Sequence, residues 1–348
     1  MISQETNKKD ELCNCTFVKT MLMVVVVFFH SIVFWRGGWF DIIKPSQGFW
    51  PYKPLAKWLQ SFHVYGFALV SGYLFYYVKY ERGGYKSLSD FIKKKVRRLL
   101  VPYFFVSIVW AIPIGIYFFH YGIQDVIRDY VFGKSPNQLW FLLMLFWALL
   151  FLLLVSDIIK KNVVTAIIAA VLFYSLSIVV GRMGGGYLQI SAGCAYLPLL
   201  ICGFLIKQYH PRLPQKMPTA MWLVSDMILL YASMALESKS GAFYIIISFA
   251  VTLALHIWGA LMAFYVLQRL ARVIKWQENA IFRFLSKHSM AIYMFHQQVI
   301  YFVLYYLNER ILPLWLGLMA FAVSITISAV IASLLLKYRI TRFLIGGK

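Results

Sequence analysis

TFVKTMLMVVVVFFHSIVFW, residues 16–35, is the stretch that decides the fold. It is an apolar run with one cation near its beginning and one imidazole near its end. About 20 residues of helix cross the roughly 30 Å hydrocarbon core of a bilayer, so the run predicts a membrane-spanning helix. A polar segment precedes the run and no small-residue cleavage site follows it, which indicates a retained span and not a signal peptide.

The two ionisable groups of this run, Lys19 and His30, lie eleven residues apart. At about 100° per residue, this spacing returns to within about 20° of the same helix face, roughly 16 Å further along the axis. An ionisable group inside a membrane helix costs about 2.5–3.5 kcal/mol on insertion scales, so His30 marks a candidate functional site. The alternative is a neutral imidazole that hydrogen-bonds to a neighbouring helix.

The whole chain has the composition of a membrane protein. Of its 348 residues, 61% are hydrophobic and 14% are charged, and its mean hydropathy is +0.71. Apolar runs of spanning length recur near residues 17–35, 61–78, 99–119, 138–156, 163–181, 191–207, 218–236, 243–268, 289–307 and 313–336. We therefore predict an all-α, polytopic membrane bundle of about ten helices. No repeat or low-complexity linker divides the sequence, so we expect one domain over 1–348, with a bundle at 17–337 between polar tails at 1–16 and 338–348.

The distribution of Lys and Arg predicts the orientation of these helices. The chain has 34 such residues and a net charge of +21. With a cytoplasmic N-terminus, 25 of the 34 fall in cytoplasmic segments, and the other nine are Arg36, Lys44, Lys53, Lys57, Arg128, Lys134, Arg182, Lys239 and Arg310. This excess favours ten spans with both termini in the cytoplasm. Orientation among membrane lipids thus explains the basic charge, and we expect no nucleic-acid partner.

A second imidazole opens the next apolar run. His63 enters this run from the predicted outer side, towards which His30 also lies, so the two rings can meet in the outer half of the bundle. A solvated, interfacial role and a catalytic role are both open for His63. In the same run, Ser71 and Gly72 form a small-residue pair of the kind found where membrane helices pack closely.

A basic stretch, residues 93–98, occupies the predicted loop before the third run and includes Lys95, Arg97 and Arg98. One interpretation is a positive-inside anchor on anionic lipid. The other is a binding site for the phosphates of a cytosolic ligand, since guanidinium groups are well suited to phosphate. The two roles are compatible with one another.

Five segments, taken in order, resemble motifs of the membrane-bound acyltransferase-3 family. Lys19 and His30 resemble its arginine and histidine with ten residues between them, and Lys replaces Arg here. The other matching segments are FHVYGFALVSGY (62–73), RRLLVPY (97–103), LWFL (139–142) and KHSMAIYMFHQ (287–297). An ammonium at Lys19 lacks the bidentate geometry of a guanidinium. Tyr65 stands where proline is usual, which affects the local helix geometry.

The resemblance implies acyl transfer from a cytosolic acyl-coenzyme A, acetyl-coenzyme A above all, to a hydroxyl of a cell-surface or secreted polysaccharide. The phosphates of the donor are then expected on Lys19, Lys95, Arg97 and Arg98. The thioester would lie near His30, whose neutral imidazole can take the proton of the attacking hydroxyl. A transient acyl-imidazole is the alternative role of His30. The implied location is a bacterial cell membrane.

An acidic group that orients the histidine is less easily found in the sequence. Asp226 lies within the seventh apolar run and is the best candidate, although a structural hydrogen bond to a neighbouring helix is an equal alternative. Asp41 and Glu309 lie just beyond the first and ninth runs. His256 and His296 are expected to be packed, hydrogen-bonded residues.

Six aromatic residues lie in the first outer segment, residues 36–60, among them Trp39, Trp50 and Trp58. Aromatic rings at membrane edges are commonly interfacial anchors. The Gly and Pro residues between them also fit a partly re-entrant lid whose rings stack on a sugar. Trp140, in the LWFL segment, is a fourth candidate contact for the acceptor.

A rival hypothesis is a transporter or flippase for a lipid-linked glycan or exopolysaccharide, which also uses many helices and buried polar groups. It does not need Lys19 and His30 on one face, and such proteins more often contain repeats. The expected partners of the acyltransferase are acyl-coenzyme A, a carbohydrate acceptor and a polysaccharide-synthesis apparatus. No metal is expected.

Overall fold

The computed structural model describes residues 2–85, 87–184, 186–210, 214 and 216–347, and these residues form helices and connections without a strand. The all-α class is thereby confirmed. The long helices are α1 (Ile2–Ile32), α2 (Tyr52–Tyr76), a continuous helical segment Leu88–Phe119, α7 (Trp140–Ile159), α8 (Val163–Gly184), α9 (Ile190–Tyr209), α11 (Thr219–Glu237), α12 (Ala242–Val273), α13 (Ala280–Leu307) and α14 (Pro313–Lys337).

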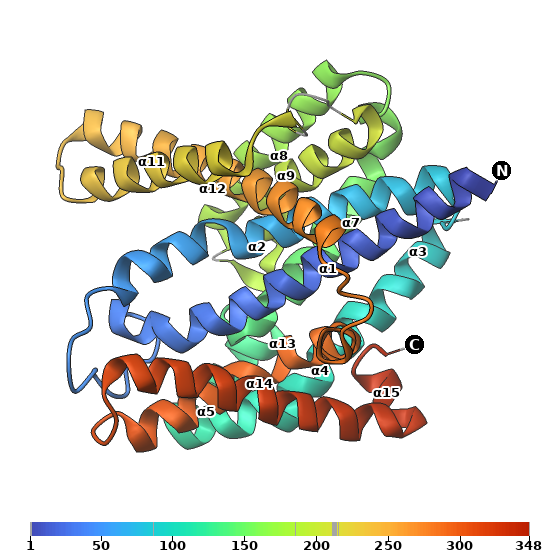
Figure 1. Ribbon diagram of the computed structural model, residues 1–348. Coiled ribbons are helices and arrows are strands. Elements are labelled where there is room, and N and C mark those ends of the chain that lie inside the picture. Colours follow the sequence, from blue (N-terminus) through green and yellow to red (C-terminus); the bar gives the residue numbers. More distant parts are fainter. Residues whose placement is uncertain (1, 86, 185, 211–213, 215, 348) are drawn as a thin grey trace.

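Helix α1 lies at the centre of the bundle and contacts α2, α12, α13 and α14. It begins at Ile2, so the predicted N-terminal tail continues this helix. Both termini lie at one end of the bundle, and the connections 37–51, 238–241 and 308–312 lie at the opposite end (Figure 1). This arrangement agrees with an even number of crossings, while the assignment of the termini to the cytoplasm stays a prediction.

Eight helices of the described residues are long and apolar enough to cross a membrane. Helices α2 and α13, with 25 and 28 residues, are long enough as well but more polar. They carry buried polar side chains such as His63, His296 and Gln298. A helix enclosed by other helices can be more polar than one that faces lipid, so α2 and α13 are compatible with two further spans. The count of about ten spans stays a prediction.

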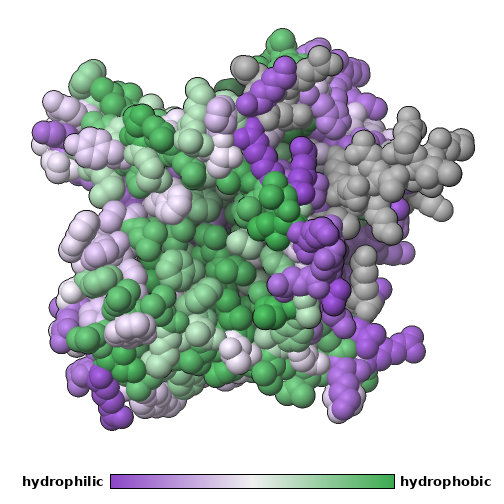
Figure 2. All heavy atoms as spheres, viewed as in Figure 1, coloured by the Kyte–Doolittle hydropathy of each residue, from purple (hydrophilic) through white to green (hydrophobic). Residues whose placement is uncertain are grey.

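The lateral surface of the bundle is apolar. Large hydrophobic side chains are exposed along several helices, for example Leu172 of α8, Ile228 of α11 and Ile245 of α12. Figure 2 shows a hydrophobic band across the middle of one face, with hydrophilic residues gathered mainly at the end where the termini lie. A soluble protein rarely exposes apolar surface on this scale, and the chain is therefore a multi-pass membrane protein.

The third long helix begins earlier than the sequence predicted. Helix α3 (Leu88–Lys95) starts after Ser87, whose hydroxyl accepts the backbone N–H of Asp90 at 3.1 Å. A π-helical turn, Val96–Leu100, then leads into α4 (Val101–Val106). The prediction of a loop at residues 93–98 is therefore wrong, because a capped helix continues through the basic stretch into the membrane span.

Two π-helical turns in this segment precede prolines. Val96–Leu100 comes before Pro102, and Ser107–Ala111 comes before Pro113 at the start of α5 (Ile112–Phe119). Proline has no N–H to donate and its ring collides with the carbonyl four residues earlier in a regular α-helix. The wider turns accommodate the prolines without ending the helix.

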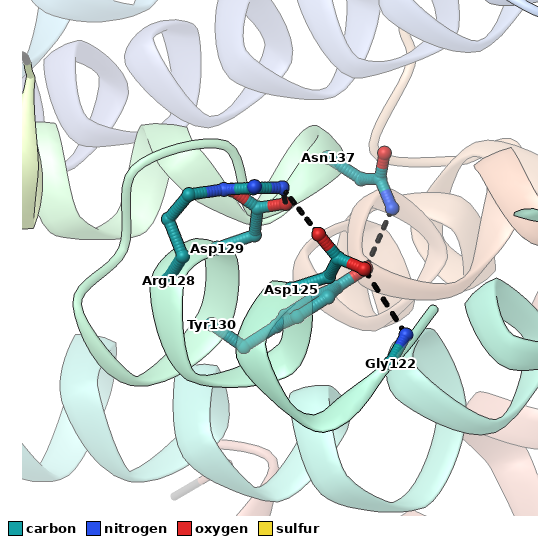
Figure 3. Close-up of polar contacts among 6 residues, drawn as sticks. All are labelled: Gly122, Asp125, Arg128, Asp129, Tyr130 and Asn137. Carbon is teal, nitrogen blue, oxygen red and sulfur yellow. Dashed lines mark hydrogen bonds and ion pairs between the residues drawn. The ribbon is translucent and has the colours of Figure 1, made fainter. Parts of the chain in front are cut away.

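A polar cluster fixes the connection between α5 and α7. Arg128 contacts Asp129 with two hydrogen bonds of 2.9 and 2.7 Å and reaches Asp125 at 3.0 Å (Figure 3). Asn137 donates to the hydroxyl of Tyr130 at 2.7 Å. The cluster holds the short helix α6 (Ile123–Val126) and the following turn at the end of the bundle opposite the termini.

Helices α2 and α9 approach each other closely through two glycines. A Cβ atom at Gly72 would lie 1.8 Å from the carbonyl oxygen of Leu200, and one at Gly203 would lie 1.9 Å from that of Leu69. Both contacts are to backbone, which cannot rotate away as a side chain can. The predicted close packing at Gly72 is confirmed.

Replacing Gly203 with alanine should lower the melting temperature of the purified protein, because overpacking of this kind costs about 1–3 kcal/mol. The matched control is Gly184→Ala, since a Cβ atom there meets nothing within 4 Å. Thermal unfolding in detergent measures the difference. Equal melting temperatures for Gly203→Ala and Gly184→Ala would contradict the packing described here.

Candidate active site

Three histidines from three helices lie close together within the bundle: His30 of α1, His63 of α2 and His296 of α13. The Nε2 atom of His296 lies 3.0 Å from Nδ1 of His30, and the ring centroids are 4.9 Å apart. His296 is fully buried and His30 half-buried. The structure therefore joins the first and ninth apolar runs through a pair of imidazoles.

The hydrogen bonds of this pair assign the tautomer of His30. Nδ1 of His296 lies 2.7 Å from the carbonyl oxygen of Tyr293, which can only accept, so Nδ1 carries the proton. In a neutral His296 ring, Nε2 is then an acceptor, and the donor to it is Nδ1–H of His30. The same Nδ1–H also faces the carbonyl of Val26 at 3.1 Å. His30 consequently keeps an unprotonated Nε2.

His63 is held in the same manner on the neighbouring helix. Its Nδ1 lies 2.6 Å from the carbonyl of Leu59, so Nδ1 donates and Nε2 carries the lone pair. Its ring packs on Phe29 with centroids 4.7 Å apart, and it is close enough to His30 and His296 to act on both electrostatically. His63 thus lies near His30 and His296 within the bundle, and its catalytic role stays a prediction.

Aromatic rings cover the histidine pair on the side away from the termini. Trp39 lies 5.4 Å from the ring of His30 and 5.1 Å from that of Tyr301. Phe40 stacks on Tyr301 with centroids 4.5 Å apart. Trp50, by contrast, is 76% exposed. The segment after α1 thus folds back over His30 through Trp39, while Trp50 lies on the surface.

Buried glutamines fix the position of α13 beside this site. The side-chain amides of Gln138 and Gln298 exchange hydrogen bonds of 2.7 and 3.1 Å, and Gln138 also donates to the carbonyl of Met294 at 2.6 Å. The hydroxyl of Tyr293 donates back to the carbonyl of Gln138. The sequence analysis missed these residues, although glutamines inside apolar runs are a signal that could have found them.

The carboxylates lie apart from the histidine pair in the hydrogen-bond network. Asp226 is fully buried, and its Oδ2 accepts the indole N–H of Trp58 at 2.8 Å. Its Oδ1 has no hydrogen-bond partner among the described residues. Asp41 and Glu309 are exposed. In the described part of the chain, an imidazole and not a carboxylate therefore contacts His30, and a catalytic role for Asp226 stays a prediction.

Trp140 belongs to an aromatic cluster that reaches His296 through Phe141 and Tyr293. Its ring lies 5.8 Å from Tyr196, which stacks on Tyr65 at 5.0 Å. Tyr65 also stacks on His256, with centroids 4.1 Å apart. Tyr65, which departs from the family's proline, thus packs between helices, and His256 is packed as expected. An acceptor contact at Trp140 stays a prediction.

A group of cations lies at the end of the bundle that holds the termini. The half-buried ammonium of Lys95 is surrounded by the charges of Arg98, Lys19 and Lys94. Its Nζ contacts the hydroxyl of Tyr85 at 3.2 Å. Burial is the main cause that raises the pKa of Tyr85 to about 12, so this hydroxyl is protonated at neutral pH.

Arg97 is separated from this group. Its guanidinium lies 5.1 Å from the ring centroid of Phe343, on the short helix α15 (Arg339–Leu344). Lys95 and Arg98 lie three residues apart on a continuous helical segment and so share a face, whereas Arg97, two residues after Lys95, points to another side. Of the four cations predicted to bind the donor, the structure brings together Lys19, Lys95 and Arg98.

The comparisons with known proteins identify the family of the chain. No group of three or more His, Cys, Asp or Glu side chains able to hold a metal occurs among the described residues. No curated protein and no solved structure matches the chain. The model of the acyltransferase domain of the acyltransferase-3 family matches residues 16–337, which include the three histidines and the cations. The chain belongs to this family of membrane acyltransferases.

Proposed function

We propose that this protein is an enzyme of a bacterial cell membrane. It transfers an acyl group, acetyl in particular, from acyl-coenzyme A to a hydroxyl of a cell-surface or secreted polysaccharide. Membership of the acyltransferase-3 family supports acyl transfer in general. The observation that carries the proposal is the His30 and His296 pair, because it leaves one lone pair at Nε2 of His30. A base in this state is what the attack of a hydroxyl requires.

In the direct route, His30 acts as a general base and the reaction has two steps. Nε2 of His30 takes the proton of the acceptor hydroxyl as its oxygen attacks the thioester carbonyl, which gives a tetrahedral oxyanion and an imidazolium. The C–S bond then breaks, the thiolate of coenzyme A leaves, and the proton passes from His30 to that sulfur. During the imidazolium stage, Nε2 of His296 accepts the Nδ1–H of His30 and stabilises its positive charge.

A covalent route uses the same lone pair. Nε2 of His30 attacks the thioester carbonyl, the C–S bond breaks, and coenzyme A leaves as a thiolate beside an acyl-imidazolium that keeps its Nδ1–H. The acceptor hydroxyl then attacks this acyl group, the C–N bond breaks and restores the lone pair of Nε2, and the proton of the hydroxyl finally neutralises the thiolate. In this route His63, whose Nε2 also carries a lone pair, can take the proton of the hydroxyl. The hydrogen bond from His30 to His296 serves both routes, since it fixes which nitrogen of His30 reacts.

The cations near the termini support a binding site for the donor. Lys19 lies on the same helix face as His30, about 16 Å along the axis, which is a distance that a pantetheine arm can span. With Lys95 and Arg98 beside it, Lys19 belongs to a concentration of positive charge suited to phosphates. The donor thus extends along α1 from the cations to the histidine.

The transporter hypothesis gains no support from the family match. It also assigns no role to a lone pair at His30. The two functions are separated by one assay: purified protein given acyl-coenzyme A and a glycan acceptor releases free coenzyme A if it is an acyltransferase. A flippase releases none.

Replacing His30 with glutamine or alanine should abolish coenzyme A release and glycan acylation, with a loss of at least about 10²-fold expected for removing a general base or nucleophile. The matched control is His288→Gln, because His288 is a buried histidine of α13 that contacts Phe284 and Ser333. Normal acylation by well-expressed His30→Gln protein would refute the mechanism.

Replacing Lys19 with alanine should raise the apparent KM for the donor more than it lowers kcat, because it removes a phosphate contact and leaves His30 intact. Lys19→Arg should bind the donor as well or better, through a bidentate guanidinium. Lys93→Ala, at an exposed position of α3, is the control. Donor titrations in nanodiscs give the answer, and an unchanged KM in Lys19→Ala would leave this residue as a topological anchor only.

A further inference from the structure

The segment between α1 and α2, residues 37–51, lies at the end of the bundle opposite the termini (Figure 1). Its first two residues, Gly37 and Gly38, have positive φ angles of 85° and 74°, which favour glycine. The next residue is Trp39, whose half-buried ring lies 5.4 Å from the ring of His30. Glycine restricts the backbone least, so the position of Trp39 over His30 depends on contacts made further along the segment.

The helix α13 provides these contacts along one face. Tyr301 and Asn308 lie seven residues apart, a spacing that returns to within about 20° of the same helix face. Asn308 directly follows the last residue of α13 and keeps helical backbone angles. The ring of Tyr301 lies 5.1 Å from that of Trp39 and stacks on Phe40, which gives the segment an apolar anchor. Asn308, only 7% exposed, gives it a polar anchor two turns further along.

The side chain of Asn308 uses both its donor and its acceptor on this segment. Its Nδ2 donates to the carbonyl of Lys44 at 2.8 Å, and its Oδ1 accepts the backbone N–H of Ser46 at 3.1 Å. The hydroxyl of Ser46 donates in return to the carbonyl of Asn308. Three hydrogen bonds thus connect the segment that carries Trp39 with the helix that carries His296.

We propose that Asn308 is a positioning residue for the acceptor, because it holds the segment that places the indole of Trp39 beside His30. This inference rests on the proposed function. The face of an indole can pack on the apolar face of a sugar ring, whose hydroxyl then lies near the imidazole. A displacement of about 1 Å at such a site can lower the rate about 10²-fold.

The position of this anchor separates the acceptor from the donor. Asn308 and residues 37–51 lie at one end of the bundle, whereas Lys19, Lys95 and Arg98 lie near the termini at the other end. A donor that extends along α1 from those cations does not pass the anchor. Loss of the anchor therefore affects binding of the acceptor and leaves binding of the donor unchanged.

Kinetics of the purified full chain test this difference. Asn308→Ala should raise the apparent KM for the glycan acceptor about tenfold, through lost hydrogen bonds, and leave the KM for acyl-coenzyme A unchanged. Ser46→Ala removes the hydroxyl that donates to Asn308 and should raise the acceptor KM less. The matched control is Asn162→Ala, because the exposed Asn162 accepts the backbone N–H of Thr165 at 2.8 Å between α7 and α8. It should change neither constant.

A chemical label reports the position of Trp39 without catalysis. Diethylpyrocarbonate modifies an unprotonated ring nitrogen of histidine, such as Nε2 of His30, and mass spectrometry of peptides measures the rate. Because Trp39 covers His30, Asn308→Ala and Trp39→Ala should both speed this labelling several-fold. Asn162→Ala should leave the rate unchanged.

A raised acceptor KM together with faster labelling of His30 supports the proposal. The proposal is overturned if folded Asn308→Ala protein keeps the acceptor KM and the labelling rate of the unaltered protein, or if both KM values rise together. If Asn308→Ala does not fold, Ser46→Ala decides by the same criteria. If the unaltered protein transfers no acyl group, the proposed function fails, and the labelling alone decides whether Asn308 holds Trp39 over His30.

Discussion

The hydrogen bond between Nδ1 of His30 and Nε2 of His296 is the interaction on which the rest of this structure depends. A polar group within a membrane bundle needs a partner, because lipid supplies none. The two rings are hydrogen-bond partners of each other. The carbonyl of Tyr293 accepts the Nδ1–H of His296, so Nε2 of His296 is the acceptor in the bond between the rings. The same bond connects α1 with α13, so packing and the proposed chemistry share one contact.

The distribution of polar residues among the helices follows from this need for hydrogen-bond partners. Helices α2 and α13 carry His63, His296 and the glutamine Gln298, and they pack against α1. Other helices, such as α8 and α11, expose apolar side chains over their outer surfaces. Helix α1 leads from the cations near the termini to the aromatic rings over His30, which gives the proposed donor and acceptor separate ends of one path.

The sequence predicted the all-α class, the presence of several membrane-spanning helices and the common helix of Lys19 and His30, because apolar length and helical periodicity are local properties. It did not predict that His296 contacts His30, since a bond between residues 266 positions apart depends on packing. Likewise, Arg97 was grouped with Lys95 and Arg98 because the stretch was predicted to be a loop, and in the helix that the structure shows Arg97 instead contacts the ring of Phe343. Asp226, chosen as a rare buried acid, bonds to Trp58 instead of a histidine.

The tautomer of His30 is the most direct test of this account. Nitrogen NMR of histidine-labelled protein, with His30 assigned by comparison with His30→Gln, distinguishes protonated from unprotonated ring nitrogens. At neutral pH the account predicts a proton on Nδ1 and none on Nε2, and a shifted Nδ1 resonance once His296→Ala removes one of the two acceptors of this proton and leaves only the carbonyl of Val26. A proton on Nε2 of His30 in the unaltered protein, or a His30 spectrum that His296→Ala leaves unchanged, would contradict it.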